Sequence, residues 1–577
     1  MKQQRNTRTL AIIACGLGTR VALFTGNNYI PKLLLNIGGK TILAKILEAE
    51  DKFDAIAIAL STQRHIDMVK QWIESNLGKD VVQKCLFVLH EKSDGSANAI
   101  ATTLQQISNI VGPSDVLLHW CDIYAPMLSN LVEGFFSIPD TDVCAGVFDE
   151  LSDKHLYLDD ANNRVVRYHD IQNLKKHGII AQSASRTLFG IYAIPQALID
   201  KAIEKCLNTS NLDFAKVMCQ IGTVDYLVVC QKPLIEKHGN IEIYGDTESY
   251  LDKCDKHVKE KEVRYFNSIE IKDDVVVKTA LCDRGYKLMD NEVEWYQICA
   301  GNGIVSNVPK VFEIGKHSFT MTKINGMTVK EYIDAFDKDC QCMPLAIGLL
   351  DMFDKQICSK LHAMQCWPQN IIKDVPVEDK LNAMLKEYVQ TTVSRYYEIS
   401  ELVKDINVYN GELLPDFNEL IVDIEDTIRK TAKDTEFCFL HGDPHVCNMM
   451  IDDEGTTLTC IDPRGYFGNG KYKKVGDADY DIAKFAFGLN GNSNFARASF
   501  HTLKQIDKHN GELQLIANVR GYDIDKLPLT NRQKFLVGLC WFKFPAWLKN
   551  NPVEAIITYC HGALMTRRYL DAWRAEL

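Results

Sequence analysis

The sequence predicts an α/β protein of two domains, in which a mixed, mostly parallel sheet with helices precedes an α+β domain. Three observations support this prediction. Short apolar runs alternate with helical segments between residues 9 and 124, which is the rhythm of a parallel sheet. A charge-dense stretch without a long apolar face follows residue 250. Beyond it, a hairpin and a helix lead into a helix-rich region, which is typical of an α+β domain.

The composition is that of a globular protein with an acidic balance. Hydrophobic residues make up 46% of the 577 residues, charged residues make up 24%, and the net charge is −11. An acidic chain is a poor candidate for broad binding of nucleic acid or anionic membranes, so we expect neither partner. The 19 cysteines are scattered without a C-x-x-C pair, which favours reduced thiols and a cytoplasmic location.

The N-terminal segment is predicted to be a buried strand and not a targeting sequence. Basic residues precede an apolar run that ends in a Gly-rich turn after about seven residues, the floor for the apolar core of a signal peptide. No segment approaches the ~18 consecutive apolar residues of a membrane span, so we expect no membrane insertion. The sequence leaves the oligomeric state open, and a homo-oligomer remains one of the alternatives.

The first strand, TLAIIA (9–14), leads into CGLGTR and then into a segment rich in basic and apolar residues. A strand, a Gly-rich loop and a helix in this order form a cradle for phosphate, because glycines let backbone N–H groups approach the anion. Gly16 and Gly18 would shape the loop, and Arg20 and Lys32 would supply positive charge. A Gly-x-Gly turn alone is common, so its interpretation depends on the residues after it.

The pattern G-x-G-T-R, succeeded a dozen residues later by P-K-x-L-x-x-I-x-G-K-x-I-L, resembles the signature of the sugar nucleotidyltransferases, including the phosphocholine cytidylyltransferases. It is carried by Gly16, Gly18, Thr19, Arg20, Pro31, Lys32, Gly39 and Lys40. Cys15 stands where the family usually has Ala or Gly. The resemblance implies a Rossmann-like nucleotidyltransferase domain over residues 1–250. It also implies nucleotide binding by Gly16, Gly18 and Thr19, catalytic roles for Arg20 and Lys32, and CTP as the nucleotide.

Later segments extend this resemblance. DGSANAI (94–100) is similar to the family turn that contacts base and ribose, which implies nucleotide binding by Gly95 and Ser96. An apolar strand ends at Asp122, which matches the aspartate that holds the catalytic Mg²⁺ in the family. NIEIYGDTESY (240–250) resembles the segment with the second metal aspartate, but Ile243 occupies that position. Glu242 and Asp246 are the displaced candidates, so the second ligand stays open.

Residues 251–262 are predicted to be a linker, and residues 263–577 form the second domain. This domain opens with a hairpin whose second strand carries Lys278, followed by a helix with Glu292. A strand lysine paired with a helix glutamate positions the α- and β-phosphates of ATP in kinase folds. Backbone atoms from Met321 to Lys323 would hold the base. No G-x-G-x-x-G loop precedes Lys278, which excludes a standard protein kinase.

A polar turn, HGDPHVCN (441–448), and the later IDPRG carry the strongest signal of this domain. In catalytic loops of the form H-x-D-x-x-x-x-N the Asp accepts the proton of the substrate hydroxyl, and the Asn and a later Asp hold Mg²⁺. Asp443 matches the base, Asn448 and Asp462 match the metal ligands, and His441 would brace the loop. His445 and Cys447 are too few to predict a zinc site.

This stretch resembles the choline kinase and aminoglycoside phosphotransferase superfamily, which implies an α+β, protein-kinase-like phosphotransferase domain. IDPRG together with GDADYDIAK (476–484) is similar to fused proteins of bacterial capsule and surface-polysaccharide loci. The resemblances imply a bifunctional enzyme that phosphorylates a small alcohol, amino alcohol or sugar with ATP and then couples that phosphate to a nucleoside monophosphate. The alternatives are a single-activity kinase with a non-catalytic first domain, and a non-catalytic scaffold. The acceptor is not predicted.

Overall fold

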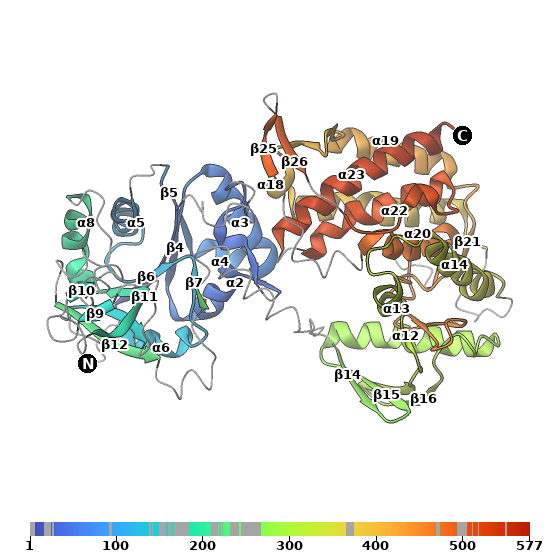
Figure 1. Ribbon diagram of the computed structural model, residues 1–577, viewed down its shortest axis with the longest axis horizontal. Coiled ribbons are helices and arrows are strands. Elements are labelled where there is room, and N and C mark those ends of the chain that lie inside the picture. Colours follow the sequence, from blue (N-terminus) through green and yellow to red (C-terminus); the bar gives the residue numbers. More distant parts are fainter. Residues whose placement is uncertain are drawn as a thin grey trace. The chain divides into compact units, whose positions relative to one another are not determined.

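The computed structural model divides the chain into two compact units, Met1–Lys259 with Lys549–Val553, and Glu260–Leu548 with Glu554–Leu577 (Figure 1). The structure describes residues 6–16, 25, 28–37, 39–91, 95–137, 140, 142–148, 157–159, 164–166, 184–208, 217, 221, 223–230, 242–243, 267–364, 374–468, 474–492, 505–509, 512–516, 519–548 and 551–577. The predicted linker, 251–262, lies outside these residues.

Unit 1 is built on a nine-stranded mixed sheet. Its central strand β1 (Thr7–Ala14) pairs in parallel with β4 (Ala55–Leu60) and β6 (Ser114–Trp120), and β4 pairs in parallel with β5 (Cys85–Leu89). β11 (Ala184–Ile194) joins β6 in the antiparallel direction. The remaining strands are β8 (Asp142–Phe148), β9 (Tyr157–Asp159), β10 (Arg164–Val166) and β12 (Thr223–Cys230). The predicted mixed α/β fold with parallel strands is confirmed.

The helices of unit 1 cover this sheet with apolar side chains. α5 (Ser96–Ile110) contacts β1, β4 and β5, and α3 (Gln63–Leu77) contacts β4 and β5. Ile100 and Leu104 of α5 are fully buried in the core formed with the central strands. The other α-helices among the described residues of unit 1 are α2 (Ile42–Ile46), α4 (Lys79–Gln83), α6 (Leu128–Phe135) and α8 (Ile199–Leu207). Because β1, β4, β5 and β6 are parallel, the loops that follow them meet at one edge of the sheet.

His119 of β6 lies in this core, and its titration predicts acid sensitivity. The side chain is buried, Nδ1 donates to the Trp120 carbonyl over 2.8 Å, and Nε2 has no hydrogen-bond partner among the described residues. Burial lowers the pKa of His119 to about 4. An unfolded histidine takes up a proton below pH ~6.5, so the stability of the neutral folded form is complete above that pH and is lost as the pH falls toward 4.

We therefore expect this site to cost up to about 1.4 kcal/mol of unfolding free energy per pH unit below 6.5. His119→Gln should show a smaller decrease in melting temperature than the wild type between pH 7 and pH 5.5. The same two proteins at pH 7.5 measure the packing effect of the substitution alone. An equal decrease in both proteins would show that His119 is not the titrating group.

Unit 2 begins with a four-stranded antiparallel sheet in the order β14-β15-β17-β16. Its strands are β14 (Asn267–Lys272), β15 (Val275–Ala280), β16 (Val311–Ile314) and β17 (Ser318–Thr322). α12 (Asp283–Gly301) packs against β15 and β16. Asp273 adopts a φ of 42° in the tight turn between β14 and β15, a conformation that Asp tolerates better than most residues.

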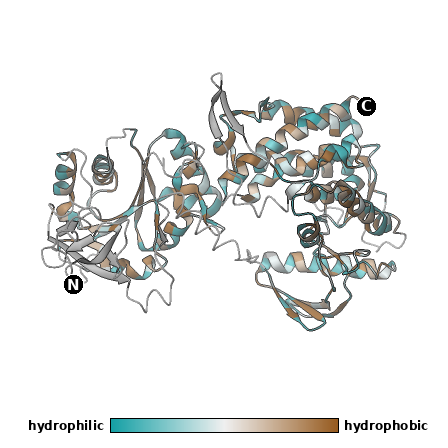
Figure 2. Cartoon of the chain, viewed as in Figure 1, coloured by the Kyte–Doolittle hydropathy of each residue, from teal (hydrophilic) through white to brown (hydrophobic). Residues whose placement is uncertain are grey.

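The rest of unit 2 is mainly helical, and Figure 2 shows hydrophobic and hydrophilic residues alternating along its helices, as amphipathic packing requires. The helices of seven or more residues are α13 (Val329–Phe336), α14 (Met343–Phe353), α16 (Val377–Met384), α17 (Thr391–Tyr397), α19 (Phe417–Thr431), α20 (Ala478–Phe487), α22 (Asn531–Lys543) and α23 (Pro552–Arg574). Among the described residues, no helix has the length and apolar character needed to cross a membrane.

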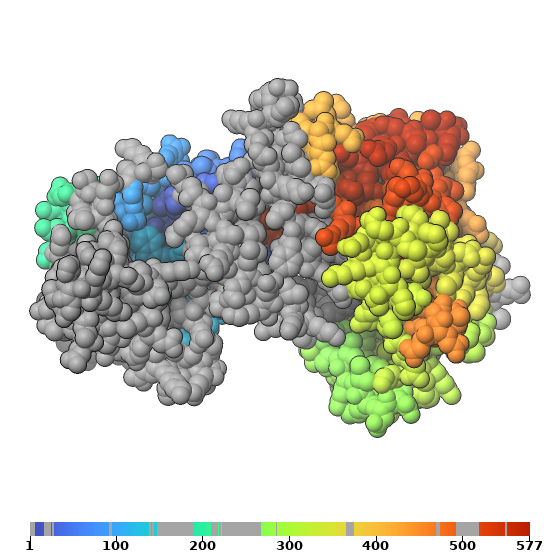
Figure 3. All heavy atoms as spheres, in the orientation of Figure 1, coloured from blue at the N-terminus to red at the C-terminus, as the bar shows by residue number. Residues whose placement is uncertain are grey.

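Short strands in unit 2 frame its polar turns. They are β18 (Met327–Thr328), β21 (Phe437–Phe439), β22 (Met449–Ile451), β23 (Leu458–Cys460) and β24 (Val475–Asp477). The hairpin turn between β22 and β23 lies on the surface beside the yellow-green helical segment in Figure 3. There the Gln356 side chain donates to the Thr456 carbonyl over 2.8 Å and accepts from the Leu458 amide over 2.9 Å. The Gln356 side chain therefore fixes the β22–β23 hairpin, whose first strand directly follows the 441–448 turn.

Candidate active sites

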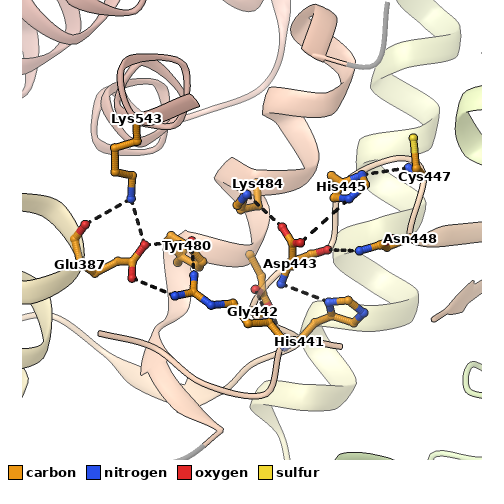
Figure 4. Close-up of polar contacts among 12 residues, drawn as sticks. Glu387, His441, Gly442, Asp443, His445, Cys447, Asn448, Tyr480, Lys484 and Lys543 are labelled. Carbon is orange, nitrogen blue, oxygen red and sulfur yellow. Dashed lines mark hydrogen bonds and ion pairs between the residues drawn. The ribbon is translucent and has the colours of Figure 1, made fainter. Parts of the chain in front are cut away.

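The turn between β21 and β22 holds the predicted base and the predicted amide ligand together (Figure 4). The Asn448 side chain donates from Nδ2 to the Asp443 carbonyl over 3.0 Å, and the His445 amide donates to the same carbonyl over 2.9 Å. The spacing of five residues therefore closes a compact loop. Its Asp443 side chain is 33% exposed, so the carboxylate is accessible from solvent.

His441 braces this loop through its two ring nitrogens, which is the role that the sequence predicts for it. It is fully buried, its Nε2 donates to the Ile461 carbonyl over 3.0 Å, and its Nδ1 accepts from the Asp443 amide over 3.2 Å. These two contacts fix one neutral tautomer, and burial lowers the pKa of His441 to about 4. His441 therefore links the Asp443 loop to the segment that carries Asp462.

Asp481 of α20 is a residue of this site that the sequence patterns did not single out. Its carboxylate is fully buried and accepts the amides of His441 and Gly442 over 2.7 and 2.9 Å. Burial raises the pKa of Asp481 to about 7, although the two amides oppose this shift. The GDADYDIAK segment was visible as a motif, but only the fold shows which backbone this aspartate holds.

Replacing Asp481 with asparagine should lower stability. The new amide group can accept fewer hydrogen bonds and presents N–H donors to backbone donors, so at least one buried amide loses its partner at a cost of about 1–3 kcal/mol. We expect a lower melting temperature for Asp481→Asn. The control Asp571→Asn changes a side chain that is 56% exposed and should stay close to the wild type. Equal melting temperatures for all three proteins would contradict this role.

Two basic side chains flank the Asp443 carboxylate (Figure 4). Lys484 Nζ lies 2.9 Å from Oδ1, and His445 Nε2 lies 4.0 Å from Oδ2. Burial would raise the pKa of Asp443, but the nearby Lys484 and His445 hold it well below its usual range. Asp443 is therefore an ionised hydrogen-bond acceptor, as a group that orients a hydroxyl must be.

Two predicted residues from other segments, Glu292 and Asp462, meet at Lys278. Its Nζ lies 2.5 Å from Glu292 Oε2 of α12 and 2.6 Å from Asp462 Oδ1, and the lysine is only 5% exposed. The Tyr296 hydroxyl donates to Glu292 Oε1 over 3.4 Å and accepts from the backbone amide of Asp462 over 3.1 Å, so it holds the Glu292 carboxylate and the Asp462 backbone. Burial raises the pKa of Glu292 to about 7, with Lys278 opposing this shift. The structure thus brings strand, helix and IDPRG turn to one point.

The sheet presents an apolar surface on the face that carries Lys278. Residues paired across antiparallel strands point to the same face, and Ile269 is paired with Lys278 while Ile271 is paired with Val276. Val276 is in turn paired with Met321 of β17. Ile269 and Ile271 are 60% and 64% exposed. An exposed apolar face beside a buried cation suits a flat ring attached to an anion.

The predicted base-binding segment, Met321 to Lys323, lies at the end of β17. Met321 is nearly buried within the sheet, and the Lys323 amide already donates to the Asp274 carbonyl over 2.9 Å. That amide is therefore engaged in the sheet. Contact between this segment and a nucleobase stays a prediction.

A buried ion cluster holds the IDPRG turn behind Asp462 (Figure 4). Glu387 accepts from Lys543 over 3.0 Å, from Arg464 over 3.4 Å and from the Tyr480 hydroxyl over 3.2 Å. Burial would raise the pKa of Glu387, but Lys543 and Arg464 hold it well below its usual range. No local pattern pointed to Glu387, because its partners are distant along the chain. The cluster joins the IDPRG turn to α20 and α22.

In unit 1 the structure brings the predicted Lys32 and Asp122 together. Lys32 Nζ lies 3.0 Å from Asp122 Oδ2, with side-chain exposures of 11% and 25%. Asp122 follows β6 and Gly16 follows β1, and the Cys121 amide donates to the Ile13 carbonyl over 3.2 Å, so these two loops leave the sheet side by side. Gly95, with a φ of 103°, precedes α5, which begins at Ser96.

The remaining predicted residues of unit 1 are described in part or not at all. Gly18, Thr19, Arg20 and Asp246 lie outside the described residues. The backbone of Glu242 lies in β13 (Glu242–Ile243), which pairs with β7 (Ile123–Tyr124) directly after Asp122. The segment with the displaced candidates therefore runs beside the Asp122 loop. Within the described part of the chain, no group of three or more His, Cys, Asp or Glu side chains is arranged to hold a metal ion.

Comparisons with known proteins find similarity to part of the chain. No protein-family model matches the sequence. No curated protein matches it either. Solved structures that are similar include a protein named as a glucose-1-phosphate thymidylyltransferase from Bacillus anthracis in complex with sucrose, which has 14% identity and a TM-score of 0.34 and covers 45% of this chain and 98% of its own.

Two further solved structures are similar to a comparable share of this chain. UDP-glucose pyrophosphorylase complexed with UDP-glucose has 13% identity and a TM-score of 0.35, over 44% of this chain and 99% of its own. HddC from Yersinia pseudotuberculosis has 18% identity and a TM-score of 0.31, over 43% of this chain and 98% of its own. Scores of this size describe a partial likeness and assign no substrate to this protein.

Proposed function

We propose that this protein is a bifunctional transferase. Unit 2 transfers phosphate from ATP to the hydroxyl of a small alcohol, amino alcohol or sugar. Unit 1 then couples that phosphate to a nucleoside monophosphate from an NTP, with CTP as the expected nucleotide, and releases pyrophosphate. The product is a nucleotide-activated precursor for a surface polysaccharide. The observation that carries the proposal is the convergence of Lys278, Glu292 and Asp462 in the same unit as the braced Asp443 loop.

For the kinase reaction, each of these side chains has a role that its contacts support. Lys278, held by Glu292, would bind the α- and β-phosphates of ATP in place of part of its present ion pairing. Asp443 is ionised and accessible, so it orients the acceptor hydroxyl and takes its proton. Asn448 and Asp462 present the oxygen donors that Mg²⁺ prefers. When bound there, Mg²⁺ supplies charge neutralisation on the phosphates.

The exposed apolar face beside Lys278 supports a nucleotide as the phosphate donor. Ile269, Ile271 and Val276 would lie against the base, and Lys278 at the buried end of the same face would meet the phosphates. Burial of the exposed isoleucines would then accompany nucleotide binding, which favours affinity for ATP over inorganic polyphosphate.

For the nucleotidyl transfer, Lys32 and Asp122 form the described part of the site. Lys32 would stabilise charge at the α-phosphate as the acceptor phosphate attacks and pyrophosphate leaves, with Arg20 as its partner in this role. The carboxylate of Asp122 fits Mg²⁺, with Glu242 or Asp246 as candidates for a second ligand. Gly16, Gly18 and Thr19 would cradle phosphates, and Gly95 and Ser96 would contact base and ribose.

One observation favours a second candidate function, a kinase whose unit 1 is not catalytic. Ile243, at the position expected for the second metal aspartate, has its backbone paired with Ile123 next to Asp122. An apolar residue there leaves Asp122 without the predicted partner unless Glu242 or Asp246 replaces it. Release of pyrophosphate separates the two functions, since a kinase alone produces none.

A product screen tests the proposal. The purified protein is incubated with Mg²⁺, ATP, each of the four common NTPs, and a panel of polyols, amino alcohols and sugars, and products are identified by mass spectrometry. We expect a phosphorylated alcohol with ATP alone and a nucleotidylated alcohol when CTP is added. Phosphorylation without any nucleotidylated product would support the single-activity kinase. Absence of both products across the panel, with no turnover of ATP, would contradict both the bifunctional proposal and the single-activity kinase.

A further inference from the structure

Lys484 is a partly buried cation to which the proposed reactions assign no role. It lies on α20, its side chain is 21% exposed, and its Nζ is 2.9 Å from Asp443 Oδ1. Figure 4 shows Lys484 approaching the carboxylate from the side opposite to Asn448. The helix therefore delivers a positive charge to the group that would meet the acceptor hydroxyl.

Two other cations near the site, Lys278 and Arg464, are paired elsewhere. Lys278 contacts Glu292 and Asp462, and Arg464 contacts Glu387. Lys484 instead pairs with Asp443 itself. Burial lowers the pKa of Lys484, but the charge of Asp443 outweighs this effect and raises it, so the ammonium group stays charged at neutral pH.

Geometry limits where a reacting phosphate can lie. A hydroxyl oriented by Asp443 lies within about 2.6–3.2 Å of its carboxylate. The phosphorus that it attacks lies about 3–3.5 Å further on. Lys484 Nζ lies 2.9 Å from the same carboxylate, on a four-carbon stem with rotatable bonds, so it can contact oxygens of a phosphoryl group that binds on its side of Asp443.

We propose that Lys484 is a further catalytic residue of the kinase site, which contacts the oxygens of the transferred phosphoryl group while Asp443 orients the acceptor hydroxyl. The inference rests on the proposed kinase function. A new bond forms between the acceptor oxygen and the γ-phosphorus, and the bond from that phosphorus to the leaving oxygen breaks with its electron pair on ADP. The hydroxyl proton passes to Asp443. Lys484 neutralises charge that is spread over the equatorial oxygens during this transfer.

A binding experiment separates this role from one in which Lys484 only positions Asp443. The probes are Mg²⁺ with ADP, which lacks the transferred group, and Mg²⁺ with ADP and aluminium fluoride, which mimics that group in flight. Isothermal titration calorimetry with the full chain gives both affinities. For Lys484→Met we expect binding of ADP–aluminium fluoride to weaken about 10- to 100-fold and binding of ADP to change less than twofold.

A second neutral variant keeps the test valid if Lys484→Met does not fold. Lys484→Gln is neutral but polar, and we expect it to lose affinity for ADP–aluminium fluoride selectively, as Lys484→Met does. Lys484→Arg keeps the charge and should recover most of the affinity for ADP–aluminium fluoride. Lys355→Met, at a side chain that is 71% exposed, is the matched control and should behave as the wild type.

Two results would overturn the inference. One is wild-type affinity for ADP–aluminium fluoride in the folded methionine or glutamine variant. The other is an equal loss for ADP and for ADP–aluminium fluoride in both neutral variants, which would indicate a structural role. A wild-type protein that binds neither probe would instead contradict the proposed kinase function, so the two failures are distinguishable.

Discussion

Replacing Asp443 with asparagine should reduce ATP-dependent phosphorylation of the acceptor by about 10²- to 10⁴-fold, the usual contribution of a positioned proton acceptor. The asparagine side chain has nearly the same shape, but it cannot take the hydroxyl proton, and it loses the ion pair with Lys484. We expect the KM for ATP to change little, because the phosphates are assigned to Lys278 and the Asn448 and Asp462 donors. Initial rates over a range of ATP concentrations, with the product followed by mass spectrometry, measure both the maximal rate and the KM for ATP.

The matched control is Asp434→Asn, at a side chain that is 75% exposed. It should phosphorylate the acceptor at the wild-type rate. A second control uses the pre-formed phosphorylated alcohol with CTP, since the Asp443→Asn protein should still nucleotidylate it. An Asp443→Asn rate within threefold of the wild type would remove Asp443 from the reaction.

The second large effect is expected in unit 1. Asp122→Asn should lower pyrophosphate release from NTP by about 100-fold or more, because the Mg²⁺ that this carboxylate is proposed to bind would supply several kcal/mol of charge stabilisation to the transition state. The substitution also leaves Lys32 without the anion that lies 3.0 Å from its Nζ. A coupled pyrophosphatase assay with the phosphorylated alcohol and CTP measures the rate.

Asp115 provides the control, because it lies at the amino end of the same strand and accepts the Gln196 amide over 2.9 Å. Asp115→Asn should retain nucleotidyl transfer, and both variants should retain the kinase step. If pyrophosphate release in Asp122→Asn equals that of the wild type, the nucleotidyl site does not lie at this end of β6, and the two-step proposal loses its second half.

Local patterns predicted the parts of this protein that depend on neighbouring residues. The apolar runs near residues 9 and 55 form β1 and β4, since a run of buried side chains specifies a central parallel strand wherever its partners lie. The spacing of Asp443 and Asn448 likewise predicted a catalytic loop, and the structure joins these two residues by a contact that spans only five residues.

Contacts between distant segments could not be predicted in the same way. Asp481 and Lys484 act on a loop about 40 residues earlier in the chain, and Glu387 is paired with Lys543 over 156 residues. Nothing in the local sequence distinguishes such buried charges from solvated ones, because burial depends on how α20 and α22 pack. These residues entered the site only through the fold.

The triad at Lys278 has a consequence for the order in which ligands arrive. One cation there faces two carboxylates, Glu292 and Asp462, within 2.6 Å. The charge of Lys278 is therefore already offset by its partners before any ligand binds, and we expect a bare triphosphate to find no uncompensated cation at the proposed phosphate position. We therefore expect free ATP to be a poor ligand of the proposed kinase site, and ATP with its divalent counterion to bind better because the counterion brings the compensating charge.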